Sequence, residues 1–185
     1  MSLTPSNYNV LKKGMEAPEF ELKGTDGEMH SISKHPDRKA YLVVFMCNHC
    51  PYVKPKMKYL KDLYDKYEKQ GLMMFGINSN DTEAYGEDDF ESMKKIAAEQ
   101  KFRFEYLIDE TQKVAKAYGA TCTPDPFLFD GSLKLVYHGR IDDAHQKSHE
   151  EAATNELEEA VQQVLAGKEV TVKEEPSYGC NVKWK

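Results

Sequence analysis

The chain contains 185 residues, 40% of them hydrophobic, and carries a formal net charge of −6. This length suits one domain with a single core, and the lysines are interleaved with acidic residues, so no basic face for nucleic acid is predicted. No apolar run is long enough to cross a bilayer or to form a secretory leader, which predicts a cytoplasmic protein without a membrane partner. Four cysteines are too few for a disulfide scaffold in a chain of this size, so we expect chemistry from them.

Turn signals and apolar spacing predict the first elements. Residues 20–22 and 30–32 flank an Asp26-Gly27 turn, which predicts a β-hairpin. The continuous apolar run at 41–46 is typical of a strand covered on both faces. Apolar side chains then recur every three or four residues over 53–67, which predicts an amphipathic helix.

The second part of the chain continues the alternation of strand and helix. The expected elements are, in order, a strand at 72–77, a helix around 90–97, a strand at 106–108, a short helix at 114–118, a hairpin of 127–129 with 135–137, and a helix at 157–165. This order predicts an α/β sandwich with a central mixed sheet.

The motif Cys47-Asn48-His49-Cys50 lies between the first central strand and the first helix. Unpaired N–H groups and the positive end of a helix dipole favour a thiolate there. One cysteine then attacks a substrate disulfide, and the other resolves the mixed disulfide. Protonated His49 would add positive charge and make the pair more oxidising. The alternatives are two inert core cysteines and a solvated turn histidine.

Several segments resemble thioredoxins and peroxiredoxins. The strand and motif at 42–50, with Pro55, are similar to a thioredoxin active-site segment, and Thr123-Pro124 resembles the loop that holds the family's cis-proline. Further similarity to peroxiredoxins of the alkyl hydroperoxide reductase and thiol-specific antioxidant type, and to a narrower peroxiredoxin-like group of bacterial redoxins, lies at 14–22, 77–81, 109–119 and 179–184.

The resemblance implies a thioredoxin-like three-layer sandwich with a central mixed β-sheet and an N-terminal β-hairpin. It divides the chain into an extension (1–13), a redoxin domain (14–168) and a docked C-terminal tail (169–185). It implies a cis Thr123–Pro124 bond that faces the cysteines, with the Thr123 backbone available to an extended substrate. No bound cofactor is required, and the implied partners are a disulfide- or thiol-bearing protein and an upstream reductant.

Two features of the sequence disagree on which cysteine is the attacking one. An ungapped strand alignment places Cys50 at the thioredoxin first-cysteine position, whereas Pro55, eight residues after Cys47, places Cys47 there. We favour Cys47 as the nucleophile, with Cys50, His49 and Pro124 completing the site.

Thiol peroxidase activity is the nearest alternative function. Peroxiredoxins hold the peroxide with a Thr three residues before the reactive Cys and a Pro seven residues before it. Those positions are Val44 and Ala40 relative to Cys47, and Cys47 and Val43 relative to Cys50. Without the hydroxyl, the hydrogen bonding that stabilises the transition state of peroxide cleavage is missing. The sequence therefore favours thiol–disulfide exchange over a peroxidase.

A metal-binding module is a third possibility. The soft ligands of the motif, Cys47, His49 and Cys50, would need a further ligand from His138, His145 or His149. A structural zinc site normally combines two well-spaced ligand clusters, and the sequence contains one, so this function is disfavoured.

Cys122 and Cys180 lie outside the motif. Cys122 precedes Pro124 by two residues, and Cys180 lies in a tail whose Val182 and Trp184 gain by docking on an apolar surface. Docking would allow Cys122 and Cys180 to form a second redox pair. The alternative is a core thiol and a tail thiol without a shared role.

Overall fold

The computed structural model describes residues 3–185, and its main feature is a mixed β-sheet. The strands of this sheet are β2 (Glu21–Gly24), β3 (Met29–Ser31), β4 (Ala40–Phe45), β5 (Leu72–Asn78), β6 (Glu105–Ile108), β8 (Asp125–Asp130) and β9 (Leu135–His138). Within residues 3–185, these seven strands lie in the order β3-β2-β6-β5-β4-β8-β9. The central strands β4, β5 and β6 are parallel, and the other neighbours pair antiparallel.

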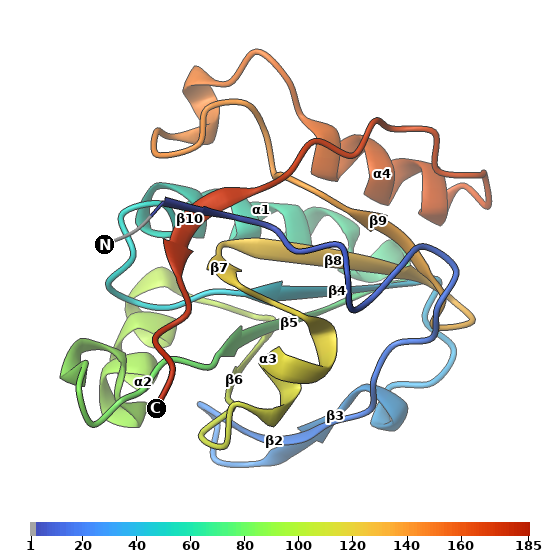
Figure 1. Cartoon of the computed structure of the whole chain (residues 1–185). Helices are drawn as coiled ribbons and strands as arrows, with labels where there is room; N and C mark the ends of the chain where they lie inside the picture. The colour runs from blue at the N-terminus through green and yellow to red at the C-terminus, as the bar shows by residue number, and fades with distance from the viewer. Residues whose placement is uncertain (1–2) are drawn as a thin grey trace.

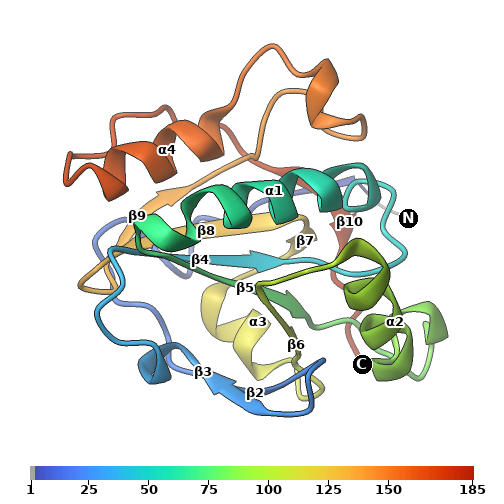
Figure 2. The ribbon, with the colours of Figure 1, turned by 180° about the vertical axis from the view of Figure 1, so that it is seen from behind.

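Helices cover both faces of the sheet. They are α1 (Met57–Tyr67), α2 (Phe90–Gln100), α3 (Lys113–Tyr118) and α4 (Glu156–Leu165). Side chains of β4 alternate between the two cores, so that Leu42 and Val44 pack with α1, α2 and α4, while Val43 and Phe45 pack with α3. Figures 1 and 2, which view the molecule from opposite sides, show α3 on one face and α1 and α2 on the other. The predicted three-layer sandwich and its N-terminal hairpin are confirmed.

The first helix begins later than its apolar pattern predicts. The Cys50 carbonyl oxygen accepts hydrogen bonds from the N–H groups of Val53 and Lys54, both at 3.0 Å, so the chain starts to coil directly after the motif. It first forms a turn and a short 3-10 segment that contains Pro55, and α1 follows from Met57. Proline is tolerated in this first turn because its missing N–H has no partner there.

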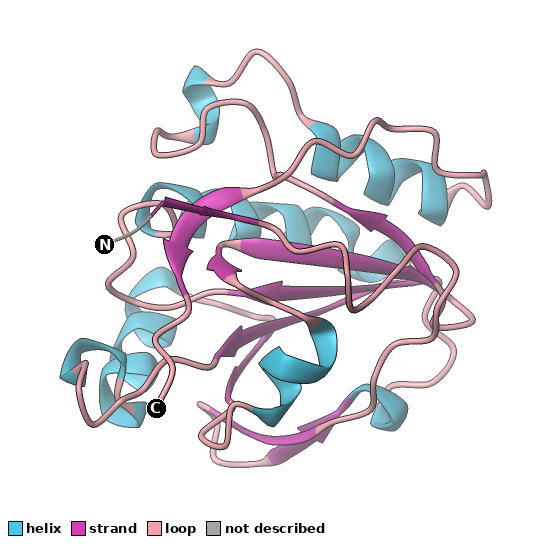
Figure 3. Ribbon diagram, viewed as in Figure 1, coloured by secondary structure: helices cyan, strands magenta, loops and turns pink. Residues whose placement is uncertain are grey.

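A second, small sheet lies beside the end of the main one, and the sequence analysis did not predict it. Within residues 3–185, its three strands are β1 (Leu3–Pro5), β7 (Cys122–Thr123) and β10 (Tyr178–Asn181), in the order β1-β10-β7. Both pairings are antiparallel. Figures 1 and 3 show β10, near the C-terminus, lying alongside the N-terminal strand β1. Of the predicted extension, residues 1 and 2 lie outside the described part of the chain.

No helix within residues 3–185 has the length and apolar composition that crossing a membrane requires.

Candidate active site

The two motif cysteines lie in the turn that leaves the central strand β4. The strand ends at Phe45, and the Met46 N–H still donates to the Ile77 carbonyl oxygen at 2.9 Å. Cys47 and Cys50 follow, with exposed fractions of 1% and 0%. Both thiols are therefore covered in this conformation.

Asp88 fixes the shape of this turn. Its Oδ1 accepts the backbone N–H of Asn48 at 2.8 Å and that of His49 at 3.2 Å, and its Oδ2 lies 2.5 Å from His49 Nδ1. The His49 ring also stacks on Tyr85, with centroids 5.5 Å apart. Any positive charge on His49 thus faces a buried carboxylate, which weakens its predicted effect on a thiolate.

A layer of buried polar side chains supports Asp88 and Asn48. Asn80 donates to Asp88 Oδ2 at 2.7 Å, and Asn78 donates to the Asp88 backbone oxygen at 2.9 Å. The Tyr106 hydroxyl donates to Asn48 Oδ1 at 2.9 Å. Local patterns cannot reveal these partners, because each contact links a different loop or strand. Such networks hold a turn in one geometry when every member is satisfied.

The loop before β8 brings Thr123 to the cysteines. The predicted cis bond between Thr123 and Pro124 is confirmed. Thr123 Oγ1 lies 3.7 Å from Cys47 Sγ, and the Cys50 thiol donates to the Thr123 carbonyl oxygen at 3.2 Å. Thr123, which sequence reasoning treated only as a backbone contact, therefore touches both sulfur atoms.

The two thiols have opposite acidities. The hydrogen bond from Cys47 lowers the pKa of Cys50 to about 5, against the effect of burial, and hydrogen bonds from Thr123 and Cys180 act in the same direction as Cys47. The same bond to Cys50 raises the pKa of Cys47, and burial and the Asp88 carboxylate raise it further. The Thr123 carbonyl oxygen accepts a hydrogen bond from the Cys50 thiol and so favours the thiol form of Cys50. The groups that donate hydrogen bonds to the Cys50 sulfur are more numerous and favour the thiolate. Cys50 is thus the more acidic sulfur.

The structure separates Cys122 from Cys180. In the β10–β7 register, Cys180 is opposite Thr123 and Asn181 is opposite Cys122. Successive side chains of a strand point to opposite faces, so Cys180 shares the face of Thr123, and Cys122 points away from it. The Cys122 thiol donates to the Ser177 carbonyl oxygen at 3.9 Å, whereas Cys180 helps to lower the pKa of Cys50. The suggested Cys122–Cys180 pair does not match this arrangement.

The histidines proposed for a metal site lie elsewhere. His138 pairs with Asp125 at 2.9 Å, and His149 pairs with Asp142 at 2.7 Å. The groups of potential ligands found within residues 3–185 contain neither histidine; one of them combines Cys47 and His49 with Asp88. Because His49 and Asp88 already bind each other, the geometry gives little support to a metal-binding module.

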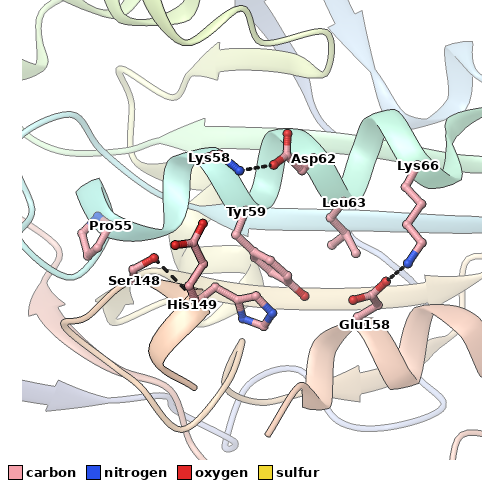
Figure 4. Close-up of a pocket in the computed structure, with 10 residues that line it drawn as sticks. Pro55, Lys58, Tyr59, Asp62, Leu63, Lys66, Ser148, His149 and Glu158 are labelled. Carbon is pink, nitrogen blue, oxygen red and sulfur yellow. Dashed lines mark hydrogen bonds and ion pairs between the residues drawn. The ribbon is translucent and has the colours of Figure 1, made fainter. Parts of the chain in front are cut away.

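A cavity lies between α1 and the 3-10 turn η5 (His149–Glu151) that precedes α4 (Figure 4). Tyr59, Leu63 and Glu158 belong to its lining, which contains neither motif cysteine. This cavity therefore gives no route to the thiols.

Comparison with known proteins places this site in a family. A model of the AhpC/TSA family matches residues 14–138. An uncharacterized conserved protein of Geobacillus kaustophilus, solved by crystallography, is 40% identical, with a TM-score of 0.92 over 100% of this chain and 97% of that chain. Thiol-disulfide oxidoreductase ResA of Geobacillus thermodenitrificans is 27% identical over 141 residues, 75% of this chain and 76% of the relative.

A solved structure of a thiol-disulfide oxidoreductase domain has a similar fold. The thioredoxin domain of a thiol-disulfide oxidoreductase from Bacteroides vulgatus, at 21% identity, has a TM-score of 0.60 and covers 69% of this chain and 88% of that chain. This similarity concerns the fold. The family model spans more than half of the sequence, from the N-terminal hairpin to the end of β9. The chain belongs to the AhpC/TSA family.

Proposed function

We propose that the protein is a thiol–disulfide oxidoreductase whose working couple is Cys47 and Cys50. The observation that carries the proposal is the position of both sulfur atoms at Thr123, the residue before the cis-proline: Thr123 Oγ1 lies 3.7 Å from Cys47 Sγ, and the Thr123 carbonyl oxygen lies 3.2 Å from Cys50 Sγ. Two adjacent thiols, one of them acidic, are what disulfide exchange requires. No bound cofactor is needed for this reaction.

We assign Cys50 as the nucleophile and Cys47 as the resolving thiol, which reverses the preference drawn from the sequence. The Cys50 thiolate attacks a substrate disulfide, whose bond breaks and releases one substrate thiolate. The Cys47 thiol then gives its proton to that thiolate and attacks Cys50 Sγ. A Cys47–Cys50 disulfide forms, the second substrate sulfur leaves, and the substrate has gained two electrons.

The partners follow from this chemistry. One is a protein with an accessible disulfide or, in the reverse direction, a dithiol, and the other is an upstream reductant that restores the Cys47–Cys50 dithiol. We propose the cytoplasm as the compartment, because four cysteines in a chain with a core of this size are not a disulfide framework.

The test is reduction of insulin disulfides by the purified protein with a chemical reductant. Cys50→Ser should abolish turnover, and Cys47→Ser should reduce it strongly. Cys122→Ser is the matched control, because this buried thiol faces away from Thr123. Turnover that survives loss of Cys50 would exclude the proposed couple.

A thiol peroxidase is the second candidate. Two features favour it: the low pKa of Cys50 and the Thr123 hydroxyl, which lies 3.7 Å from Cys47. This hydroxyl comes from the loop before β8 and not from the threonine position of the peroxiredoxin motif. Stopped-flow oxidation by hydrogen peroxide separates the candidates. A peroxidase reacts with peroxide far faster than with a disulfide, whereas an oxidoreductase shows the opposite order.

A further inference from the structure

Strand β10 occupies the edge at which an extended substrate was expected to pair. Cys180 is the antiparallel partner of Thr123, the residue before the cis-proline. An incoming peptide that adds a strand at this edge would use the same backbone groups. The chain's own C-terminal segment thus lies where a substrate strand would lie.

Cys180 takes the position of a substrate cysteine within this strand. Hydrogen bonds from its thiol and its backbone help to lower the pKa of Cys50. Its side chain is on the face of Thr123, whose carbonyl oxygen is 3.2 Å from Cys50 Sγ. Three cysteines are therefore gathered around Thr123: Cys47 and Cys50 contact it, and Cys180 is its partner in the small sheet.

The segments on both sides of Cys180 are anchored. Before it, Ser177 Oγ donates to the Pro124 carbonyl oxygen at 2.6 Å. After it, the Lys183 N–H donates to Asn80 Oδ1 at 2.9 Å. Gly179 lies so close to the loop that a Cβ atom there would be 1.9 Å from the Thr123 oxygen. A side chain at Gly179 is thus incompatible with this docking.

We propose that β10 is an intramolecular substrate and that Cys180 is a third redox cysteine, which exchanges disulfides with Cys50. This inference rests on the proposed function of the Cys47–Cys50 couple. The Cys180 thiol attacks Cys50 Sγ in the Cys47–Cys50 disulfide, the bond between Cys47 and Cys50 breaks, and a Cys50–Cys180 bond forms. Cys47 leaves with the electron pair and takes the proton that Cys180 loses, so no external oxidant or reductant is consumed.

The exchange has a consequence for access to the site. With Cys47 and Cys50 covered in the docked conformation, a protein disulfide reaches Cys50 only after β10 leaves the Thr123 edge. A Cys50–Cys180 disulfide fixes β10 in place, whereas the Cys47–Cys50 disulfide leaves it free to open. The position of the disulfide therefore controls whether an external partner can dock.

The first test maps disulfides after titration with oxidised glutathione and quenching by acid. We expect Cys50–Cys180 beside Cys47–Cys50 in the wild-type protein, Cys50–Cys180 as the main linkage in Cys47→Ser, and no change in Cys122→Ser. A Cys47→Ser protein that carries only glutathionylated Cys50, or a Cys122–Cys180 linkage, would overturn the proposal.

The second test leaves every cysteine in place. Gly179→Ala should displace β10 and increase the alkylation rate of Cys50 in the reduced protein by about tenfold or more, the factor that corresponds to about 1.4 kcal/mol. Gly86→Ala is the control, because a Cβ there meets nothing within 4 Å. Equal rates in Gly179→Ala and the wild-type protein would contradict the docking role of β10.

The role of Cys180 and the Cys47–Cys50 couple can be excluded independently of each other. If Cys180→Ser keeps insulin reduction and the wild-type protein forms only Cys47–Cys50, the third redox cysteine is excluded and the proposed function stands. If no Cys47–Cys50 disulfide forms in either protein, the proposed function itself is excluded.

Discussion

The carboxylate of Asp88 lies 2.5 Å from His49 Nδ1, and both side chains are almost completely buried. Asp88 lies just before α2, whereas His49 lies between the two motif cysteines. The pair therefore ties the approach to α2 to the reactive turn. It also places a negative charge near Cys47, whose pKa it helps to raise.

Replacement of Asp88 should loosen this turn. Asp88→Asn removes the charge that binds His49 and weakens the hydrogen bonds accepted from the backbone of Asn48 and His49. We expect a loss of about 2–4 kcal/mol in the free energy of unfolding and a lower pKa of Cys47. Denaturant unfolding of the reduced protein measures the free energy, and the rate of alkylation as a function of pH measures the pKa of Cys47. Glu91→Gln, which changes an exposed pair with Lys94, is the control and should change stability by less than about 0.5 kcal/mol.

A buried ion pair holds the segment after the motif. Lys56 Nζ lies 2.6 and 2.7 Å from the two Asp142 carboxylate oxygens, and both residues are buried. Lys56→Met should cost about 3–5 kcal/mol, because it leaves the Asp142 carboxylate without its buried cation. The double variant Lys56→Met/Asp142→Leu should recover part of that loss. Lys58→Met breaks an exposed pair and is the control, which should leave stability almost unchanged.

Thiolate formation should be visible at unusually low pH. Because the pKa of Cys50 is lowered to about 5, the ultraviolet absorbance of one thiolate should increase as the pH rises through that value. The transition should vanish in Cys50→Ser and persist in Cys122→Ser. In Cys47→Ala its midpoint should move upward, because the thiol that donates to Cys50 is removed. A wild-type protein with no thiolate below pH 8 would show that the Thr123 carbonyl, rather than the donors, decides the state of Cys50.

The same group makes stability depend on pH. The folded pKa of Cys50, about 5, lies below its ordinary value of 9.0, so its stabilising contribution is complete above pH 9 and is lost as the pH falls toward 5. The raised pKa values of Cys47 and Cys180 act in the opposite sense, and only above pH 9. Relative to Cys50→Ser, the reduced wild-type protein should therefore lose more than about 1 kcal/mol of stability between pH 9 and pH 5. Parallel pH curves for the two proteins would rule this out.

The elements of the main sheet could be predicted because their signals are local. The apolar run before Cys47, the Asp26-Gly27 turn and the spacing of apolar residues in α1 each occupy one stretch of sequence. The small sheet could not be predicted, because β10 is stabilised by partners far away in the chain, such as Thr123. Short strands of this kind carry no periodicity of their own.

In the candidate site, too, the local motifs could be predicted and the long-range contacts could not. The Cys-x-x-Cys motif and the Thr123–Pro124 bond follow from short motifs, and Asp88 reads as one of several acidic residues near a helix start. Its role depends on burial against His49, which no spacing encodes. Which cysteine attacks and which resolves likewise depends on the thiol that faces the Thr123 oxygen and Cys180, and no spacing encodes this.

The measurement that tests the central claim most directly is a redox titration of the full chain in glutathione buffers, with the disulfides mapped at each potential. We expect a two-electron couple in which Cys47 and Cys50 become linked. A midpoint of about −270 mV would indicate a reductase, and a midpoint of about −120 mV would indicate an oxidant. Full oxidation of the protein with Cys47 and Cys50 still unlinked to each other would contradict that expectation.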